Sequence, residues 1–405
     1  MLKHKKLSFL SLGLFTSIAF AVHAAPQQQR VVVAPTCLSK NITATHKILS
    51  SNGNITLIET TDSGIHQLNT AKHKQKRVCG GFMDVTSEWN AFKTKNLSDN
   101  SATRFLTDYE THAKTALANT HRIYDVKYQA QVNNLLKQLN PQNMWNDLTT
   151  LTNFTNRNAT SDYGVTAANW IKTQIETIAK STGHNDVSVY FVETIGYKQP
   201  SVVAKFGKST GPGIVIGGHM DTDSWSSSRQ PGADDDGTGT VTVLETARTL
   251  LSSGMQFNKP IYFIWYAAEE KGLVGSKYVV ADFKKKNIPV DAVIQFDMTG
   301  YANDNTMWLI NDFVSPDLTK YLETLINTYV KQPVKYTKCG YACSDHASWN
   351  KGGFAASMPF ESAFGEDNES IHSANDTMDK LSLNHMTDYA KLAVAFAVEL
   401  AEPVA

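Results

Sequence analysis

Cysteine, proline and an excess of charge of either sign are scarce in this sequence. Of its 405 residues, four are cysteine and 12 are proline, and 38 basic side chains balance 38 acidic ones. Because phosphate backbones bind basic surfaces, the zero net charge argues against a nucleic-acid partner. Internal repeats and low-complexity tracts are also lacking. The remaining composition, 41% hydrophobic and 19% charged, is that of a soluble globular protein, and the length of 405 residues predicts more than one folding unit.

Long apolar runs are confined to the N-terminus. Residues 3–6 form a cationic start, residues 7–22 form an apolar run, and Val22 and Ala24 end it with small residues at the offsets of a cleavage site. This order predicts a secretory signal peptide over residues 1–24, cleaved after Ala24, and hence a secreted, extracellular protein. A membrane anchor is the alternative. It is disfavoured because the run is short and contains three serines, and no later stretch is long and apolar enough to span a bilayer.

The four cysteines are Cys37, Cys79, Cys339 and Cys343. An even number in an exported protein suggests disulfides. The close pair Cys339 and Cys343 can close a small loop, which leaves Cys37 and Cys79 for a second bridge, although three pairings are formally possible. A metal site on Cys339 and Cys343 is the competing interpretation. It is disfavoured because no second cysteine pair is near and export favours oxidation.

The character of the chain changes near residue 126. Residues 25–125 are polar, rich in Asn, Thr and Lys, and only weakly periodic. We interpret them as a small prosegment, with a permanent accessory domain as the alternative. Residues 126–405 form the second unit, and helical periodicity begins there at Gln129.

Short apolar runs alternate with helical patterns in the second unit. Strands are expected at residues 187–192, 201–206, 213–217, 261–267, 292–296 and 354–360. Helices are expected at residues 129–139, 144–154, 167–179, 238–251 and 383–400. Most of these strands lack polar alternation, which is typical of buried parallel strands. The sequence therefore predicts an α/β fold with a mixed, mainly parallel central sheet and helices on both faces.

Several polar side chains follow the predicted buried strands or lie in Gly-rich loops. They are His219, Asp235, Glu269, Glu270, Asp297 and His372. Because sites form at the carboxyl ends of strands in open α/β sheets, we expect these side chains to converge on one rim. Two histidines with several carboxylates suit Zn²⁺, with Mn²⁺ or Co²⁺ as substitutes. A metal pair would also offset the repulsion among the carboxylates.

Each of these features alone has an ordinary explanation. A lone histidine after a strand is usually structural, an Asp run in a Gly-rich loop is usually turn chemistry, and a Glu pair is usually on the surface. The adjacent residues Ser344, Asp345 and His346 superficially suggest a nucleophilic triad. Adjacent side chains cannot easily adopt that geometry, and no GxSxG motif occurs, so we interpret them as structural.

Seven ordered motifs carry a family resemblance. They are GGHMD, PGADDDGTGT, YAAEEKGLVGS, QFDMTG, CGYACSDHASW, MPFES and IHSANDT. From about Gln129 to Leu400 the chain resembles the secreted bacterial leucyl aminopeptidases, which carry a co-catalytic zinc pair. The resemblance implies a zinc exopeptidase fold and removal of the N-terminal residue from peptides with a free N-terminus. It does not reach residues 25–125, although such relatives often carry a removable prosegment.

The resemblance also implies the ligands of two Zn²⁺ ions per chain. Asp235, the middle residue of an Asp triplet, would bridge both ions. His219 and Asp297 would complete the ligand set of one ion, and Glu270 and His372 would complete that of the other.

Three further roles follow from the same resemblance. Glu269, next to a ligand but not itself one, would be the general base and acid. Asp221 would orient the imidazole of His219. Tyr341 is a candidate donor to the developing oxyanion, with simple pocket lining as the equally weighted alternative.

The expected specificity pocket is apolar. By resemblance its lining is Met298, Ile310, Cys339, Cys343, Met358, Phe360, Phe364 and Ile371. Such a pocket favours Leu, Phe or Met at the substrate N-terminus. Asp367 falls where relatives that prefer leucine carry an aromatic residue, and a carboxylate there could pair with a Lys or Arg side chain. The alternative is that Asp367 belongs to a solvated acidic loop.

Other activities on the same zinc architecture remain as alternatives. Carboxypeptidases, deacylases and glutaminyl cyclases usually change the bridging or base position or add an insertion, and non-enzymatic binding ectodomains typically lose ligands. This chain keeps every expected position. We therefore expect a monomeric enzyme that acts on peptides.

Overall fold

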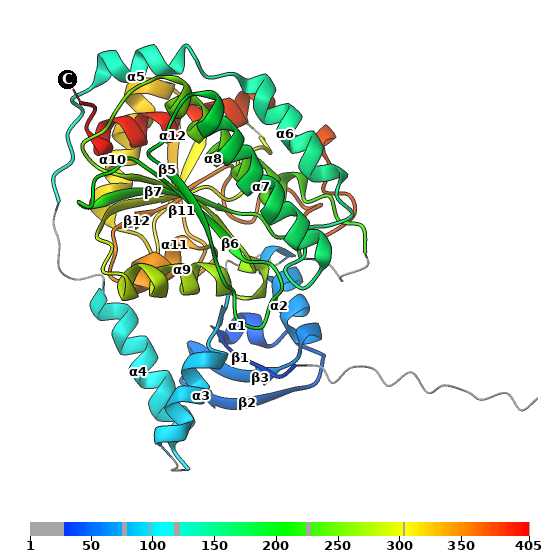
Figure 1. The fold of residues 1–405 in the computed structure, drawn as a ribbon. Coiled ribbons are helices and arrows are strands. Elements are labelled where there is room, and N and C mark those ends of the chain that lie inside the picture. Colours follow the sequence, from blue (N-terminus) through cyan, green and yellow to red (C-terminus); the bar gives the residue numbers. More distant parts are fainter. Residues whose placement is uncertain are drawn as a thin grey trace, which may run out of the picture.

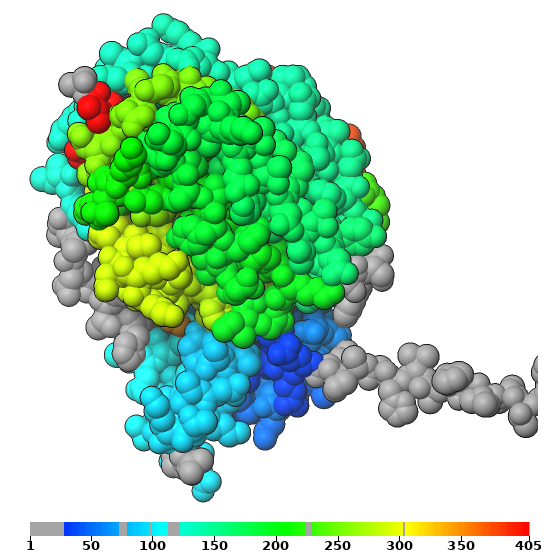
Figure 2. Space-filling view, in the orientation of Figure 1, coloured from blue at the N-terminus to red at the C-terminus, as the bar shows by residue number. Residues whose placement is uncertain are grey.

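The computed structural model describes residues 28–74, 79–96, 99–116, 122–223, 228–302 and 304–404, so the predicted signal peptide lies outside the described residues. Two units are visible. A small N-terminal unit lies beneath a larger α/β unit, and the two are in contact (Figures 1 and 2). No helix within the described ranges is long and apolar enough to cross a membrane.

The N-terminal unit is built on a four-stranded sheet of order β2-β3-β1-β4. Its pairs β2/β3, β3/β1 and β1/β4 are all antiparallel. Its elements are β1 (Arg30–Pro35), α1 (Thr36–Ser39), β2 (His46–Ser51), β3 (Ile55–Thr60), α2 (Asp62–Lys74), β4 (Met83–Asp84), α3 (Thr86–Lys95) and α4 (Ser101–Ala116). Strand β1 lies between β3 and β4 and is buried along its whole length, because its residues Val31 to Ala34 are apolar.

The larger unit contains a six-stranded sheet of order β12-β9-β7-β8-β6-β5. Its strands are β5 (Val187–Val192), β6 (Ser201–Phe206), β7 (Gly213–His219), β8 (Ile261–Tyr266), β9 (Val290–Gln295) and β12 (Ala356–Ser357). The pairs β12/β9, β9/β7 and β7/β8 are parallel, whereas β8/β6 and β6/β5 are antiparallel. The predicted fold class, a mixed and mainly parallel sheet, is confirmed.

Helices cover both faces of this sheet (Figure 1). The helices are α5 (Gln129–Leu136), α6 (Pro141–Asn153), α7 (Asp162–Ser181), α8 (Gly239–Ser252), α9 (Val274–Lys285), α10 (Pro316–Leu325), α11 (His346–Lys351) and α12 (Leu383–Ala401). One face packs against α7, α8 and α12 in the largest apolar cluster, and the other packs against α9 and α11. Ser161, Asn140 and Ser382 cap the N-termini of α7, α6 and α12 with side-chain hydrogen bonds, which fixes where these helices begin.

The expected single strand at residues 354–360 is instead two short strands. After β12 the chain leaves the main sheet, and β13 (Pro359–Phe360) joins β10 (Met307–Ile310) and β11 (Val334–Thr337) in a small separate sheet. The backbone carbonyl of Met358 accepts a hydrogen bond from the amide of Ile310, which draws the chain towards β10. Periodicity could not predict this change because both strands are buried.

Candidate metal centre and active site

Three adjacent parallel strands deliver polar residues to one edge of the sheet. His219 ends β7, Glu269 and Glu270 follow β8, and Asp297 follows β9. The chain leaves β8 through Ala268, which has a left-handed φ of 52°, and this turn separates the two glutamates from the strand. The predicted convergence on one rim is therefore what the structure contains.

Two further residues reach this rim from loops. Asp235 lies in the turn before α8, and His372 lies in the loop before α12. The Oδ1 atom of Asp235 is 3.1 Å from Nε2 of His219, and its Oδ2 atom is 2.8 Å from Nε2 of His372. One carboxylate thus lies between two histidines, with one oxygen facing each of them.

The side chains around Asp235 form two groups, each compact enough for one cation. In the first, ligand atoms of His219, Asp235 and Asp297 all lie within 4.8 Å of one another. In the second, Glu270 and His372 are joined by Asp223 at the same mutual spacing. Nε2 of His219 is 3.5 Å from Oδ1 of Asp297, and Nε2 of His372 is 3.2 Å from Oε2 of Glu270.

The chemistry of these atoms fits zinc. His219 is fully buried, and within the described residues neither of its ring nitrogens makes a hydrogen bond. Burial opposes the charge on its imidazole, but Asp297, Asp221 and Asp235 hold its pKa well above the usual value. Buried histidine nitrogens facing several carboxylates are a ligand set that Zn²⁺ favours, and a cation there would balance the concentrated negative charge.

Asp221 supports the site from behind. Its Oδ1 atom is 3.4 Å from Nδ1 of His219, as expected for a carboxylate that orients a metal-binding imidazole. The same side chain accepts hydrogen bonds from the backbone amides of Glu269 (3.0 Å) and Glu270 (3.3 Å). Asp221 therefore positions the glutamate pair as well as the histidine, a second role that the sequence did not indicate.

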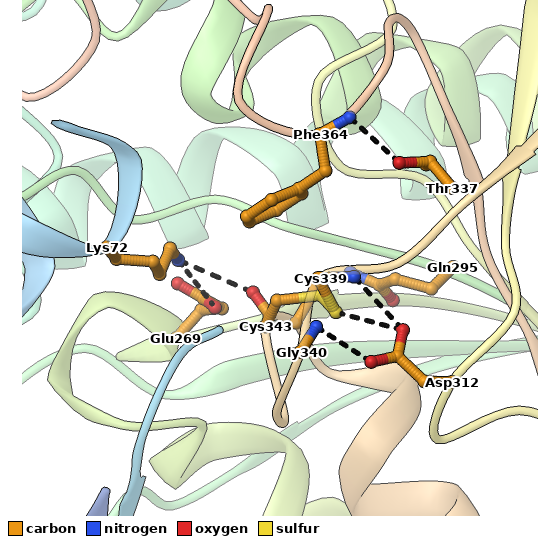
Figure 3. The surroundings of a disulfide bond; sticks show 10 residues. Lys72, Glu269, Gln295, Asp312, Thr337, Cys339, Gly340, Cys343 and Phe364 are labelled. Carbon is orange, nitrogen blue, oxygen red and sulfur yellow. Dashed lines mark hydrogen bonds and ion pairs between the residues drawn. A yellow bond between two sulfur atoms is a disulfide. The ribbon is translucent and has the colours of Figure 1, made fainter. Parts of the chain in front are cut away.

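Glu269 is buried beside the two groups. Burial raises its pKa well above that of an exposed glutamate, and the neighbouring Lys72 opposes this shift. Nζ of Lys72, from α2 of the N-terminal unit, is 3.7 Å from Oε1 of Glu269 (Figure 3). A raised pKa favours the protonated carboxyl group, which is the form that acts as a general acid.

Asp223 was missed by the sequence reasoning. It accepts a hydrogen bond from His66 of α2 (2.9 Å) and forms an ion pair with Lys271 (3.1 Å). Its backbone amide donates to Oε1 of Glu270 at 3.0 Å. A signal was available, because His219, Asp221 and Asp223 alternate along the sequence, and alternate residues of an extended segment share one side.

The predicted apolar pocket residues pack together. One buried cluster contains Met298, Ile310, Val314, Cys339, Cys343, Met358, Phe360, Phe364 and Ile371. The disulfide Cys339–Cys343 forms part of this wall, with Phe364 above it (Figure 3). Asp367 is only 6% exposed, and its Oδ1 atom accepts a hydrogen bond from the Gly365 amide at 2.8 Å. This burial argues against the alternative of a solvated loop at Asp367.

Tyr341 lies towards the N-terminal unit. Its hydroxyl donates to the hydroxyl of Tyr109 at 3.2 Å, and its ring meets the edge of Phe313. The ring belongs to the apolar cluster that also holds β1 and α4 of the N-terminal unit. In this arrangement the Tyr341 hydroxyl is hydrogen-bonded to the N-terminal unit.

Both predicted disulfides are present, Cys37–Cys79 and Cys339–Cys343. Cys339 and Cys343 lie close to His346. Because both sulfurs are in a disulfide, they are not thiolate ligands, and the competing metal interpretation of this pair does not hold.

Comparison with known proteins agrees with this geometry. Residues 201–397 match the model of peptidase family M28. The leucine aminopeptidase 1 of Coccidioides posadasii is 40% identical over 293 residues, covering 68% of this chain and 75% of that protein. The crystal structure of the Legionella pneumophila LapA aminopeptidase is 44% identical, covers 94% of this chain and all of that one, and superposes with a TM-score of 0.84. LapB from the same organism is 40% identical, with coverages of 93% and 100% and a TM-score of 0.81. The chain belongs to peptidase family M28 and is a metallo-aminopeptidase.

Proposed function

We propose that this enzyme is secreted, binds two zinc ions and removes the N-terminal residue of peptides with a free N-terminus. The observation that carries the proposal is the Asp235 carboxylate, which lies between His219 and His372 with one oxygen facing each. A carboxylate in this position suits a bridging ligand, because each oxygen can serve one ion of a closely spaced pair.

The two ligand sets divide around Asp235. His219 and Asp297 would complete the site of one ion, and Glu270 and His372 that of the other. When bound, such ions lower the pKa of a water molecule and polarise the scissile carbonyl group.

Glu269 carries the proton in this mechanism. Its carboxylate takes a proton from the attacking water and then gives it to the leaving amine, so the group returns to its starting state. The backbone amide of Glu269 donates to Asp221, which holds the base at a fixed distance from His219.

The side-chain preference depends on the buried pocket. Its apolar wall suits Leu, Phe or Met, and the stem of a Lys or Arg side chain would also pack along it. We propose that Asp367 shifts the preference towards basic residues. Its support is that this carboxylate is buried and electrostatically close to Asp234 and Glu361, which makes the region around it acidic.

The N-terminal segment is proposed to be processed in two steps. Residues 1–24 would be removed on export, and residues 25–125 would be a prosegment of the catalytic unit 126–405. The two disulfides fit an extracellular destination, since such bonds persist in oxidising compartments.

The test is a substrate panel on the secreted protein after removal of the N-terminal unit, combined with metal analysis. We expect two zinc ions per chain, hydrolysis of Leu-p-nitroanilide and of a dipeptide anilide with a free N-terminus, and no cleavage of the N-acetylated dipeptide anilide. Cleavage of the acetylated compound would instead indicate a deacylase or an endopeptidase. Asp367→Asn should lower the rate on Lys- and Arg-p-nitroanilide relative to Leu-p-nitroanilide. An unchanged ratio would show that Asp367 does not set the side-chain preference.

A further inference from the structure

Helix α2 of the N-terminal unit presents three polar side chains to the catalytic residues. His66, Asn69 and Lys72 are spaced three residues apart, so they share one side of the helix. His66 contacts Asp223 at 2.9 Å, and the Asn69 amide donates to Oε2 of Glu270 at 3.0 Å. Together with the contact of Lys72 to Glu269 (3.7 Å), they place one face of a single helix directly over the catalytic centre.

Lys72 reaches furthest into the site. Its side chain is 6% exposed, and its Nζ atom lies 3.7 Å from Oε1 of Glu269 and 3.4 Å from the carbonyl oxygen of Cys343. Figure 3 shows the ammonium group between the catalytic glutamate and the loop that walls the pocket. A buried ammonium is costly unless it is paired, so these two partners hold it in place.

A second contact anchors the N-terminal unit on the pocket wall. The amide of Gly81 donates to the carbonyl of Tyr341 at 2.6 Å. A Cβ atom on Gly81 would lie 2.5 Å from the carbonyl oxygen of Ala342, and one on Gly80 would collide with the backbone of Tyr341. Only glycine permits this close approach, so the segment after α2 fits closely against the loop between Cys339 and Cys343.

The chemistry of Lys72 matches that of the substrate. An aminopeptidase binds a peptide through a primary ammonium group, and Lys72 brings a primary alkylammonium to the carboxylate that would act on that peptide. The helix also covers Glu270 through Asn69, so a peptide N-terminus and α2 cannot both occupy this space.

We propose that the N-terminal unit is a built-in pseudo-substrate inhibitor whose Lys72 ammonium occupies the place of the substrate N-terminus beside Glu269. This inference rests on the proposed aminopeptidase function and names the regulation of that site. The inhibitor is then competitive, and Lys72 supplies the charged contact that holds α2 over the site.

The test compares full-length secreted variants, loaded with zinc, by their kcat/KM on Leu-p-nitroanilide. Wild type treated with a protease that removes the N-terminal unit sets the maximum rate. Lys72→Met removes the charge at similar length, and we expect the activity of the full chain to rise at least tenfold. Lys72→Arg keeps the charge and should stay near wild type. Lys47→Met, at an exposed position of β2, is the matched control and should not differ from wild type.

A second readout separates loss of the contact from loss of the fold. Hydrogen exchange, followed by mass spectrometry, should become faster in peptides from α2 in the Lys72→Met variant. Peptides from β1 and β3 should keep their protection. Equal loss of protection in α2 and in the strands would mean that the N-terminal unit unfolds. Asn69→Leu would then replace Lys72→Met as the variant that weakens the contact of α2 with the catalytic centre.

The outcomes distinguish this inference from the proposed function. Full-length wild type as active as the treated enzyme, or a Lys72→Met chain that stays inactive while the treated wild type is active, overturns the inhibitor. A treated enzyme that cleaves no substrate of the panel overturns the proposed function instead. In that case activity cannot report on the inhibitor, and hydrogen exchange alone tests whether Lys72 holds α2 in the site. Unchanged exchange in Lys72→Met would show that it does not.

Discussion

Glu269 is buried among groups of its own charge. Glu270 and Asp297 both raise its pKa, and desolvation raises it most. These influences favour a carboxyl group that can hold the proton it receives until the leaving amine takes it. The same burial explains why the ammonium group of Lys72, 3.7 Å away, is a favourable partner for this carboxylate.

Replacing the proposed base, Glu269, should change the rate of the chemical step without changing metal binding. For Glu269→Gln we expect kcat to fall by about 10²–10⁴-fold, the range for loss of a general base. Zinc content should stay as in wild type, because Glu269 is outside both ligand groups. Steady-state kinetics with metal analysis on the processed enzyme checks this. Retention of full activity would exclude Glu269 as the base.

His346 should make stability depend on pH. It is fully buried, and burial lowers its pKa from 6.5 to about 4. Between pH 6.5 and 4 the unfolded chain binds a proton that the folded chain does not. Stability is therefore complete above pH 6.5 and is lost as the pH falls towards 4, by about 3 kcal/mol for a shift of this size.

The measurement is urea unfolding of the metal-free protein from pH 4 to 7.5. Metal-free protein is used because acid also releases zinc. His346→Leu, which cannot titrate, should show a flatter dependence than wild type. Parallel curves for the two proteins would show that His346 does not contribute.

At the scale of single residues, much of the site was predictable. The proposed ligands follow strands or lie in Gly-rich turns, and this pattern is local in sequence. Lys72 was not predictable, because nothing local distinguishes it from its neighbour Lys74 or from any solvated lysine. Its significance arises only when α2 is placed over a residue almost two hundred positions away.

At the scale of elements, helix α8 begins under tight packing. Its first residue, Gly239, donates its amide to Oδ1 of Asp236 at 2.8 Å. A Cβ atom there would lie 2.5 Å from the carbonyl oxygen of Phe296 and would also collide with the Asp236 carboxylate. The turn that carries Asp235 is therefore held by close contact between α8 and the end of β9.

Adding one methyl group at Gly239 should disturb this turn. For Gly239→Ala we expect a loss of about 1–3 kcal/mol in the free energy of unfolding, the usual range for overpacking, together with reduced zinc affinity. Urea unfolding and zinc titration measure the two effects. Gly211→Ala is the control, because its Cβ atom would meet only a serine hydroxyl at 3.4 Å. Equal behaviour of the two variants would contradict the packing argument.

Most elements of the larger unit agree with the sequence patterns, because its helices bury one apolar face and several strands of its main sheet are buried along nearly their whole length. Strands β5 and β6 match the expected ranges at both ends, and α12 differs by one residue. The N-terminal unit was different. Its strand β2 is largely exposed, so the sequence there is polar with weak periodicity. The buried strands β1 and β3 of this unit were not predicted.

At the scale of the whole molecule, bound metal should contribute to stability. An ion that binds only the folded state stabilises it by mass action, by about 4 kcal/mol at a thousandfold excess over its dissociation constant. Removing zinc with a chelator should abolish activity and lower the thermal midpoint of the processed enzyme. Calorimetry with and without chelator measures this. Zinc should restore both properties and magnesium neither, and an unchanged midpoint would argue against metal in the folded enzyme.

The disulfide between Cys37 and Cys79 has a consequence for the proposed removal of the N-terminal unit. Helix α2 lies inside the loop that this bond closes. A single cut anywhere between the two cysteines leaves both fragments covalently tied, so Lys72 stays tethered near Glu269 after the backbone is broken. Full release needs a cut beyond Cys79. A nicked but still silent form should therefore migrate as one band without reductant and as two bands with it, and its presence would mark an intermediate stage of maturation.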